Sequence, residues 1–295
     1  MRNNLKKRIL KKQFNHFENN QFSEFFSKST FKDAFLFEKD QSLPKISIIM
    51  PSFNQVEFIE RSILSVLNQN YRNFELIIID GGSTDGTVDL IRKYEKYIFH
   101  WVSEKDKGQS DALNKGIRKA SGDLVGWMNS DDVYLENAFQ EVANEYLKNT
   151  TCKVFFGNTI SIDENDKLID LNLSFPFSSN HLKHEGFVAV TQSLFWSSKL
   201  NNAIHFDISL FTNMDLDIYF QINEAYSIRD WKYVNCFFGG FRKQMNQKTS
   251  EKYSAVIMQD LLYIENKHDI KIRRSLIKKI IYKSKRFWYN LYLSR

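Results

Sequence analysis

A short polar segment contains two adjacent acids, Asn129-Ser130-Asp131-Asp132, directly after an apolar run. Neighbouring carboxylates repel one another unless a cation lies between them. Mg²⁺ and Mn²⁺ prefer oxygen ligands and commonly bind one or two carboxylates together with substrate phosphates. Asp131 and Asp132 therefore suggest a divalent-metal site. Taken alone, the segment is better explained by Ser130 or Asp131 capping a helix that begins near residue 134.

A second polar segment, Asp80-Gly81-Gly82-Ser83-Thr84-Asp85-Gly86, also follows an apolar run. Its glycines permit tight turns and close approach of a ligand. Asp80 is placed to accept hydrogen bonds from a base or a ribose, although a simple strand-to-helix turn with a cap explains the segment as well. The dinucleotide fingerprint G-x-G-x-x-G is absent, and so is the P-loop sequence.

A third polar segment, residues 103–116, contains Gly108 and Asp111 and runs into a predicted helix. A helix N-terminus can face a phosphate or a hydroxyl-rich ligand. By itself the segment is typical of a solvated loop.

The elements that must position these segments alternate along the chain. Short apolar runs predict buried strands, the longer segments with apolar residues every three or four positions predict helices, and the alternation predicts an α/β doubly wound, mostly parallel sheet. In such sheets ligands bind beyond the carboxyl ends of the strands. The polar segments fall at those ends. The predicted strands are 46–50, 76–79, 98–103 and 124–128, and the predicted helices are 56–68, 84–96, 109–120 and 134–148.

The second half of the chain is less regular. We expect a strand over 154–162, a turn over 163–167, an irregular region over 170–205, a helix over 213–226 and an extended segment over 232–241. Such irregularity is typical of a substrate-specific region that follows a nucleotide-binding half.

The order and spacing of Pro51-Ser52-Phe53-Asn54, Asp80–Asp85, Asp106–Gly116 and Ser130-Asp131-Asp132 resemble family 2 glycosyltransferases, which are inverting enzymes of the GT-A fold. The resemblance covers roughly residues 45–250 and is most specific across 45–135. It implies transfer of a sugar from a nucleotide-sugar donor, best a UDP-sugar, to a glycan or lipid-linked acceptor. The corresponding process is bacterial surface polysaccharide or glycolipid biosynthesis.

The resemblance also implies roles for single residues. Pro51, Ser52, Phe53, Asn54 and Asp80 correspond to positions that hold the base and the ribose, and Gly108 and Asp111 to positions near the nucleoside. Asp132 matches the direct ligand of a Mn²⁺ or Mg²⁺ ion, and Asp131 lies nearer the ribose or a metal-bound water.

The family's catalytic base matches Asp215, in the segment Asn213-Met214-Asp215-Leu216-Asp217. An inverting transfer requires one carboxylate to take the proton of the acceptor hydroxyl. Asp217 is the second candidate, and capping of the helix is the alternative explanation for Asp215. Gln192 resembles a family position near the acceptor or the sugar.

One position departs from the family pattern. Relatives often have a metal-binding His two residues after the Arg that corresponds to Arg242, and here Gln244 occupies that position. The departure implies weaker metal binding, or phosphate contacts made by Arg242 and Lys248. It also leaves open a catalytically degraded, sugar-nucleotide-binding scaffold protein. A nucleotidyltransferase is disfavoured because no Gly-rich basic segment follows the first strand.

Charge divides the chain into a central domain and two basic ends. Of the overall net charge of +6, residues 1–44 carry +4 and residues 266–295 carry +9, so residues 45–265 carry −7. This distribution argues against nucleic-acid binding at the site. We expect a helical extension over 1–44 that packs on the domain or contacts a partner or a membrane. We also expect a GT-A domain over 45–265, with its nucleotide-sugar half at 45–135 and its acceptor half at 136–265.

Residues 266–295 predict a basic amphipathic helix with aromatic residues near its end, which suits an anionic membrane surface. A helix packed on the domain is the alternative. The chain has no apolar run long enough to span a bilayer, and its two cysteines, Cys152 and Cys236, suggest a reducing compartment. We therefore expect a cytoplasmic protein, peripheral at the inner face of the plasma membrane.

Overall fold

A computed structural model describes residues 40–186, 189–245 and 247–272. The predicted N-terminal helical extension, up to residue 39, and the predicted basic helix from residue 273 onward lie outside the described residues. Within the described residues, no helix combines the length and apolar character required to cross a membrane.

The first half of the chain forms four parallel strands, as predicted, and their order in the sheet is β3-β2-β1-β4. Every residue of β1 and β2 is buried, which explains their continuous apolar sequences. Ser52 lies opposite Asp80, and Asp80 lies opposite Ser103, so the carboxyl ends of these strands meet at one edge. The strands are β1 (Ile46–Ser52), β2 (Phe74–Asp80), β3 (His100–Ser103) and β4 (Leu124–Trp127).

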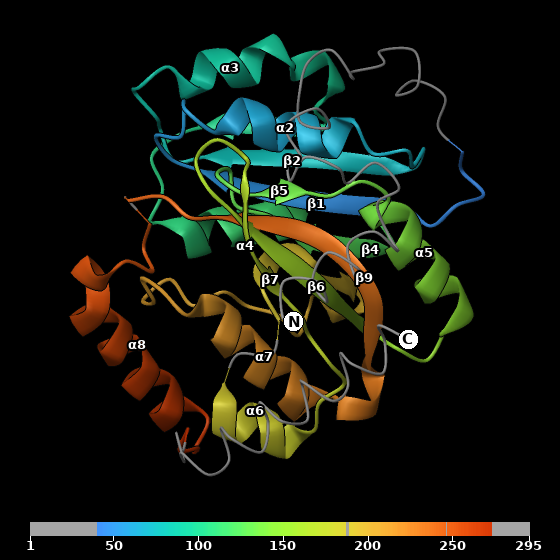
Figure 1. Cartoon of the computed structure of the whole chain (residues 1–295), viewed down its shortest axis with the longest axis vertical. Coiled ribbons are helices and arrows are strands. Elements are labelled where there is room, and N and C mark those ends of the chain that lie inside the picture. The colour runs from blue at the N-terminus through green and yellow to red at the C-terminus, as the bar shows by residue number, and fades with distance from the viewer. Residues whose placement is uncertain (1–39, 187–188, 246, 273–295) are drawn as a thin grey trace.

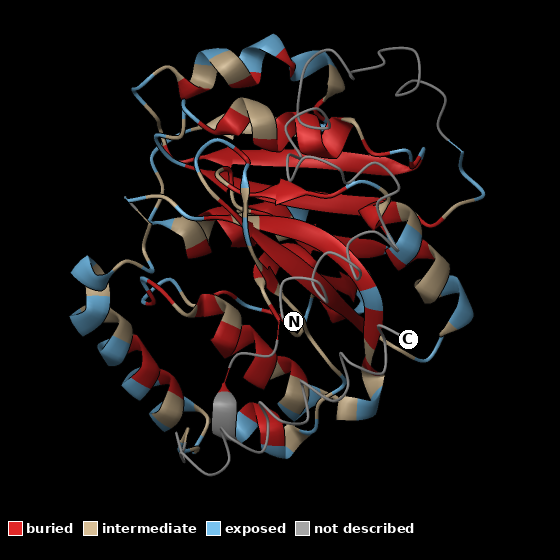
Figure 2. Cartoon of the chain, in the orientation of Figure 1, coloured by how far each residue is buried: buried red, intermediate tan, exposed pale blue. Residues whose placement is uncertain are grey.

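Helices cover both faces of this parallel half (Figure 1). On one face, α2 (Ile59–Leu67) and α3 (Thr87–Lys93) pack on Ile46, Ile48 and Met50. On the other face, α4 (Gln109–Lys119) packs so closely that a Cβ on Gly116 would lie 2.3 Å from the Cγ2 of Ile49. Figure 2 shows the buried strands between helices that are buried on one side only.

The second half extends the same sheet to nine strands, in the order β4-β8-β6-β9-β5, with β7 beside β6. A region expected to be irregular, 170–205, in fact contains α6 (Ser179–Glu185) and the buried strand β8 (Leu194–Ser197). This strand pairs with β4 on one side and β6 on the other, so it joins the two halves. The remaining strands are β5 (Val133–Tyr134), β6 (Val154–Ile162), β7 (Leu168–Asn172) and β9 (Trp231–Arg242).

The remaining helices differ from the predictions in two places. The helix expected from residue 134 is α5 (Ala138–Lys148), because residues 133–134 instead form β5, which pairs with the end of β9. The helix α7 (Met214–Ala225) was predicted, whereas α8 (Ser254–Lys267) was not. The expected boundary between residues 265 and 266 lies inside α8.

Candidate active site

The carboxylate of Asp80 organises the turn that follows β2. It is fully buried, and it accepts hydrogen bonds from the Ser83 backbone N–H at 2.8 Å, the Ser83 Oγ at 2.5 Å and the Ser103 Oγ at 2.6 Å. These bonds connect the ends of β2 and β3. Asp80 therefore shapes one wall of the sheet edge on which the predicted nucleotide contacts lie.

The turn after β1 is tied to the turn after β2. Asn54 adopts a left-handed conformation with φ 51°, its backbone N–H donates to the Ser83 Oγ at 2.7 Å, and its Oδ1 accepts from the Thr84 N–H at 3.0 Å. Ser52 is buried, whereas Phe53 is 59% exposed at the rim. Pro51, Ser52, Phe53 and Asn54 thus lie together with the Asp80 turn, as the spacing predicted.

The N-terminus of α4 brings a further carboxylate to this edge. Asp106 lies so close to the turn after β2 that a Cβ on Gly81 would be 2.9 Å from its Oδ2, and it accepts a bond from the Gly108 N–H at 2.8 Å. Burial raises the pKa of Asp106, and the nearby Asp111 and Asp80 carboxylates raise it further. Asp106 therefore connects the turn after β2 to the start of α4, where Gly108 and Asp111 lie. Asp106 was not among the predicted site residues.

Asp131 and Asp132 follow β4 at the same edge. Asp132 is 1% exposed, and its Oδ1 accepts a hydrogen bond from the Arg242 backbone N–H at 2.8 Å. Burial raises the pKa of Asp132 well above its usual range, and the adjacent Asp131 carboxylate raises it further. The alternative that this segment caps a helix is wrong, because α5 begins after Asn137 and β5 intervenes.

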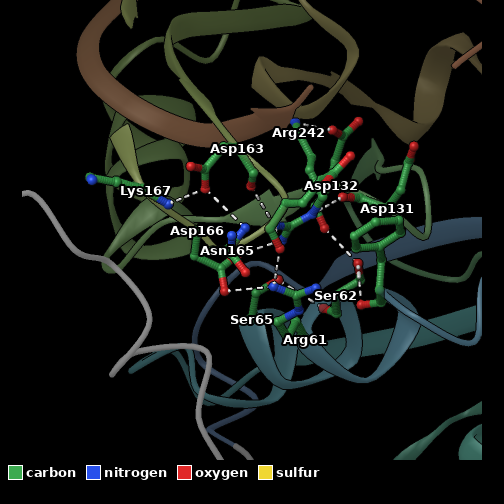
Figure 3. Close-up of polar contacts among 12 residues, drawn as sticks. Arg61, Ser62, Ser65, Asp131, Asp132, Asp163, Asn165, Asp166, Lys167 and Arg242 are labelled. Atoms are coloured by element: carbon green, nitrogen blue, oxygen red, sulfur yellow. Dashed lines mark hydrogen bonds and ion pairs between the residues drawn. The ribbon is translucent and has the colours of Figure 1, made fainter. Parts of the chain in front are cut away.

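Three successive carbonyl groups hold this acidic segment against its neighbours. The Ser62 Oγ of α2 shares its single proton between the Ser130 carbonyl at 2.8 Å and the Asp132 carbonyl at 2.6 Å, and the Arg242 Nε donates to the Asp131 carbonyl at 2.8 Å (Figure 3). With their backbone oxygens fixed by α2 and β9, the two acids keep a defined orientation.

Arg242, which was predicted to contact the donor, is surrounded by protein groups. The side chain is fully buried, and its guanidinium donates to the Asp163 carbonyl at 3.0 Å and lies 2.6 Å from the Asp166 carboxylate. Together with the bond to the Asp131 carbonyl, these contacts engage every guanidinium nitrogen. Arg242 therefore holds the acidic segment in place, and its predicted contact with the donor stays a prediction.

Gln244 lies beside the acidic pair, where the resemblance predicted it. Its Nε2 donates to the Asp131 Oδ2 at 3.0 Å. The side chain that replaces the expected His thus contacts this pair as a hydrogen-bond donor.

A chain of polar side chains leads from the acidic pair across the site. The Asn129 Nδ2 donates to the Asp132 Oδ2 at 3.3 Å, the Gln109 Nε2 donates to the Asn129 Oδ1 at 2.6 Å, and the Lys248 Nζ donates to the Gln109 Oε1 at 3.2 Å. Burial lowers the pKa of Lys248, although the Asp106 and Asp260 carboxylates oppose this. Gln109 and Asn129 were not among the predicted site residues. The only sequence signal for them was their position, at the N-terminus of a predicted helix and after a predicted strand.

Asp215 lies in the first turn of α7, two residues after the N-cap residue Asn213. Its Oδ1 accepts a hydrogen bond from the Leu216 N–H at 3.0 Å, and burial raises its pKa to about 6. An acid with such a pKa is ionised at neutral pH yet basic enough to accept a proton. The cap position belongs to Asn213, so capping does not account for Asp215.

Asp217, the second candidate for the base, is committed to the protein interior. It is fully buried, and it binds the Lys267 Nζ at 3.0 Å, the His268 Nε2 at 2.7 Å and the Gln221 Nε2 at 2.7 Å. These contacts link α7 to α8, which favours a structural function for Asp217.

Gln192 is fully buried beside β9, where a Cβ on Gly239 would lie 2.6 Å from its Cγ. Its Oε1 accepts from the Thr191 Oγ1 at 3.0 Å, while its Nε2 has no acceptor within the described part of the chain. This position lies in the short helical turn Thr191–Ser193 just before β8, and it packs against β9, the strand that ends at Arg242.

The sequence matches the family model for glycosyl transferase family 2 over residues 47–212, which is more than half of the chain. The chain belongs to glycosyltransferase family 2.

Curated relatives agree with this family. The chain is 27% identical to the chondroitin synthase of Escherichia coli over 65% of its own length and 28% of the relative. It is 34% identical to the putative teichuronic acid biosynthesis glycosyltransferase TuaG of Bacillus subtilis, over 38% of its length and 46% of TuaG. The chain thus matches less than half of each of these relatives.

Solved structures show that this family 2 chain has the GT-A glycosyltransferase fold. S. aureus TarS, solved with UDP-GlcNAc, superposes with a TM-score of 0.58 at 16% identity, covering 77% of this chain and 68% of TarS. The mannosyltransferase PcManGT of Pyrobaculum calidifontis, solved with GDP-Man and Mn²⁺, superposes with a TM-score of 0.56 at 16% identity, covering 79% and 66%.

The acidic pair of this family 2 protein fits a divalent cation. The buried Asp132 and the half-buried Asp131 lie side by side with raised pKa values, and a cation would offset their repulsion. No group of three or more His, Cys, Asp or Glu side chains suited to a metal occurs among the described residues. The two carboxylates of Asp131 and Asp132 suit an ion such as Mg²⁺, which keeps several bound waters and binds substrate phosphates alongside one or two carboxylates.

Proposed function

We propose that this chain transfers a sugar from a nucleotide-sugar donor, a UDP-sugar, to a glycan or lipid-linked acceptor with inversion, in the synthesis of a surface polysaccharide or glycolipid. The observation that carries the proposal is the meeting of Asp80, Asp111 and the Asp131–Asp132 pair at one sheet edge of a family 2 fold. The solved relative TarS holds UDP-GlcNAc, which supports this class of donor.

The nucleoside would lie against the turns after β1 and β2. Hydroxyl and amide donors there, together with the Asp80 and Asp111 carboxylates, suit a ribose and a base. Asp131 and Asp132 would hold a Mn²⁺ or Mg²⁺ ion, which supplies charge neutralisation for the departing nucleoside diphosphate. PcManGT was solved in complex with GDP-Man and Mn²⁺, which supports a metal of this kind.

Asp215 would act as the base. Its carboxylate takes the proton of the acceptor hydroxyl while the hydroxyl oxygen forms a bond to the anomeric carbon and the bond from that carbon to the diphosphate oxygen breaks. The raised pKa of about 6 suits this task, because the group is ionised at neutral pH and still accepts a proton.

We further propose that the protein is cytoplasmic and that the basic residues 266–295, with a net charge of +9, hold it at an anionic membrane surface where a lipid-linked acceptor lies. The acidic central region, residues 45–265, gives no support to a nucleic-acid partner.

A donor screen tests the proposal. Purified protein is incubated with a panel of UDP-, GDP- and TDP-sugars in the presence of Mn²⁺, Mg²⁺ or EDTA, and thermal shift and slow release of nucleoside diphosphate are measured. We expect a metal-dependent shift with one donor, which is lost in Asp132→Ala. A donor-dependent shift without any release of nucleoside diphosphate, also with acceptors present, would favour the sugar-nucleotide-binding scaffold that Gln244 leaves open. Absence of any donor-dependent shift would overturn the proposed donor site.

A further inference from the structure

The turn between β6 and β7 contains a buried carboxylate that no catalytic step described above uses. Asp166 lies on this turn with φ 63° and is only 3% exposed. Turns between strands are ordinarily exposed, and a charged side chain is rarely buried without a partner. The burial of Asp166 therefore calls for a specific explanation.

Two arginines from different elements converge on this carboxylate (Figure 3). The Arg61 Nη1 of α2 lies 3.0 Å from the Asp166 Oδ2 and also donates to the Glu164 carbonyl at 2.7 Å. The Arg242 Nη2 of β9 lies 2.6 Å from the Asp166 Oδ1. Asp166 thus connects the turn between β6 and β7 to α2 and to β9, the two elements that contact the acidic pair.

Both partners lead directly to the acidic pair. Arg242 donates from its side chain to the Asp131 carbonyl and from its backbone to the Asp132 carboxylate, each at 2.8 Å. Next to Arg61 on α2, the Ser62 Oγ donates to the Asp132 carbonyl at 2.6 Å. The orientation of both acids therefore depends on where α2 and Arg242 lie.

Charge explains why one carboxylate is required at this place. Arg242 is fully buried, and the Arg61 guanidinium lies nearby and lowers the pKa of Arg242, after burial itself. Without an anion between them, the two guanidinium groups would repel each other in a poorly solvated region. The Asp166 carboxylate removes that repulsion and fixes the direction in which the Arg242 side chain extends.

We propose that Asp166 is a positioning residue for the donor site: through Arg242 and Arg61 it sets the orientation of Asp131 and Asp132. This inference rests on the proposed function, because it assigns a purpose to a group that supports the acidic pair. Groups that orient metal ligands in other proteins change metal affinity or activity about 10- to 100-fold when removed.

The test is the substitution Asp166→Asn. Asn keeps the size of the side chain and tolerates the left-handed conformation, while it removes the charge. We expect the Kd of Mn²⁺–UDP, measured by calorimetry, to rise about 10- to 100-fold. Hydrogen exchange of the backbone amides of residues 129–134 should become faster by about tenfold.

The matched control is Glu75→Gln. Glu75 is also a buried carboxylate, 2% exposed, that pairs with Lys45 and accepts from the Ser47 Oγ at 2.6 Å, but it lies at the start of β2, at the opposite edge of the sheet. Its loss should lower Tm and leave the Kd of Mn²⁺–UDP within about twofold. Arg61→Gln provides a milder second variant, since the Arg61 side chain is 26% exposed.

The outcomes separate the two proposals. If wild-type protein binds Mn²⁺–UDP and Asp166→Asn and Arg61→Gln both bind it equally well, the positioning function is overturned and the proposed enzyme activity stands. If the wild type does not bind Mn²⁺–UDP, the proposed function fails, and hydrogen exchange alone decides. Faster exchange at residues 129–134 in Asp166→Asn, but not in Glu75→Gln, would support positioning, and unchanged exchange would overturn it.

Discussion

Asp215 has a carboxyl group with a pKa raised to about 6, mainly because burial disfavours its charged form. The backbone N–H of Leu216 stabilises the ionised form and opposes this effect only in part. A group with this pKa changes its protonation state within the range in which the enzyme can be assayed. A substitution and a pH profile can therefore both report on this single residue.

Replacing Asp215 by Asn removes the proton acceptor and keeps the shape of the side chain. We expect turnover to fall by about 10²- to 10⁴-fold, the usual contribution of a positioned base, while the Kd for the donor stays unchanged. Product formation under saturating donor and acceptor, together with calorimetric donor binding, measures the two effects. Asp217→Asn is the comparison, and a larger loss of turnover in that variant at equal Tm would reassign the base.

The pH dependence of wild-type turnover should report the same group. The base acts only when it is ionised, so the rate should rise with pH and reach half of its plateau near pH 6. Initial rates measured between pH 5 and 8 give kcat/KM at each pH, and these values test the expected rise. A rate that is constant across this range would exclude Asp215 as the titrating base.

Gln244 offers a third prediction at the scale of residues. Its amide is hydrogen-bonded to the Asp131 carboxylate at 3.0 Å, so a ring nitrogen placed there would lie near the proposed metal. We expect Gln244→His to tighten Mn²⁺ binding in the presence of UDP by about tenfold, which corresponds to about 1.4 kcal/mol. Mn²⁺ titration followed by electron paramagnetic resonance measures it, with Gln244→Asn as the control. Equal Mn²⁺ affinity in Gln244→His and the wild type would show that this position does not reach the metal.

At the scale of elements, the contact between α7 and α8 depends on buried charge. His268, at the end of α8, lies 2.7 Å from the carboxylates of both Asp217 and Glu224. Burial alone would lower the pKa of His268, but these two carboxylates raise it above its usual value. Since α7 carries Asp215 in its first turn, this contact also supports the proposed base.

The raised pKa of His268 sets the sign of the resulting pH effect. Protonated His268 stabilises the fold fully below its unfolded-state pKa of about 6.5, and this contribution is lost as pH rises through the higher folded-state value. We expect His268→Gln to lower stability by about 1 to 3 kcal/mol near pH 6 and by less near pH 9. Denaturant unfolding of both proteins at the two pH values measures the difference. A larger effect near pH 9 than near pH 6 would contradict the prediction.

At the scale of the whole molecule, one continuous sheet connects the first half of the chain to the second half. Strand β8 pairs with β4 and β6, and the end of β9 returns to pair with β5 directly after the acidic pair. The edge at which the donor is proposed to bind is therefore built from both halves of the chain. A substitution in either half should therefore be able to change donor binding at this edge.

Charge at the scale of the molecule predicts membrane association. Residues 273–295 contain eight of the ten Lys and Arg residues of the basic C-terminal region, and each such residue contributes about 1 kcal/mol near an anionic surface. We expect the full chain to sediment with phosphatidylglycerol vesicles at low salt, and a chain ending at residue 272 to lose most of this binding. Phosphatidylcholine vesicles are the control. Equal sedimentation of the two proteins would place any membrane contact elsewhere.

Local sequence patterns were enough to predict the parallel half of the fold and the strand ends at which the candidate site residues lie. Buried parallel strands read as continuous apolar runs, and the residues after them necessarily meet at one edge, which brought Asn54, Asp80 and Asp132 together in the prediction. The same local signals located Asp215 at the start of α7.

Long-range contacts, in contrast, establish how the second half completes the site. Strand β5 has two residues and β8 has four, and both form because strands distant in sequence pair with them. No local sequence pattern predicts such pairing. The orientation of the Arg242 side chain toward Asp166 has the same origin. It depends on the ion pair with Asp166, which lies on the β6–β7 turn 76 residues earlier in the chain. Spacing along the sequence does not encode such a long-range charge pairing.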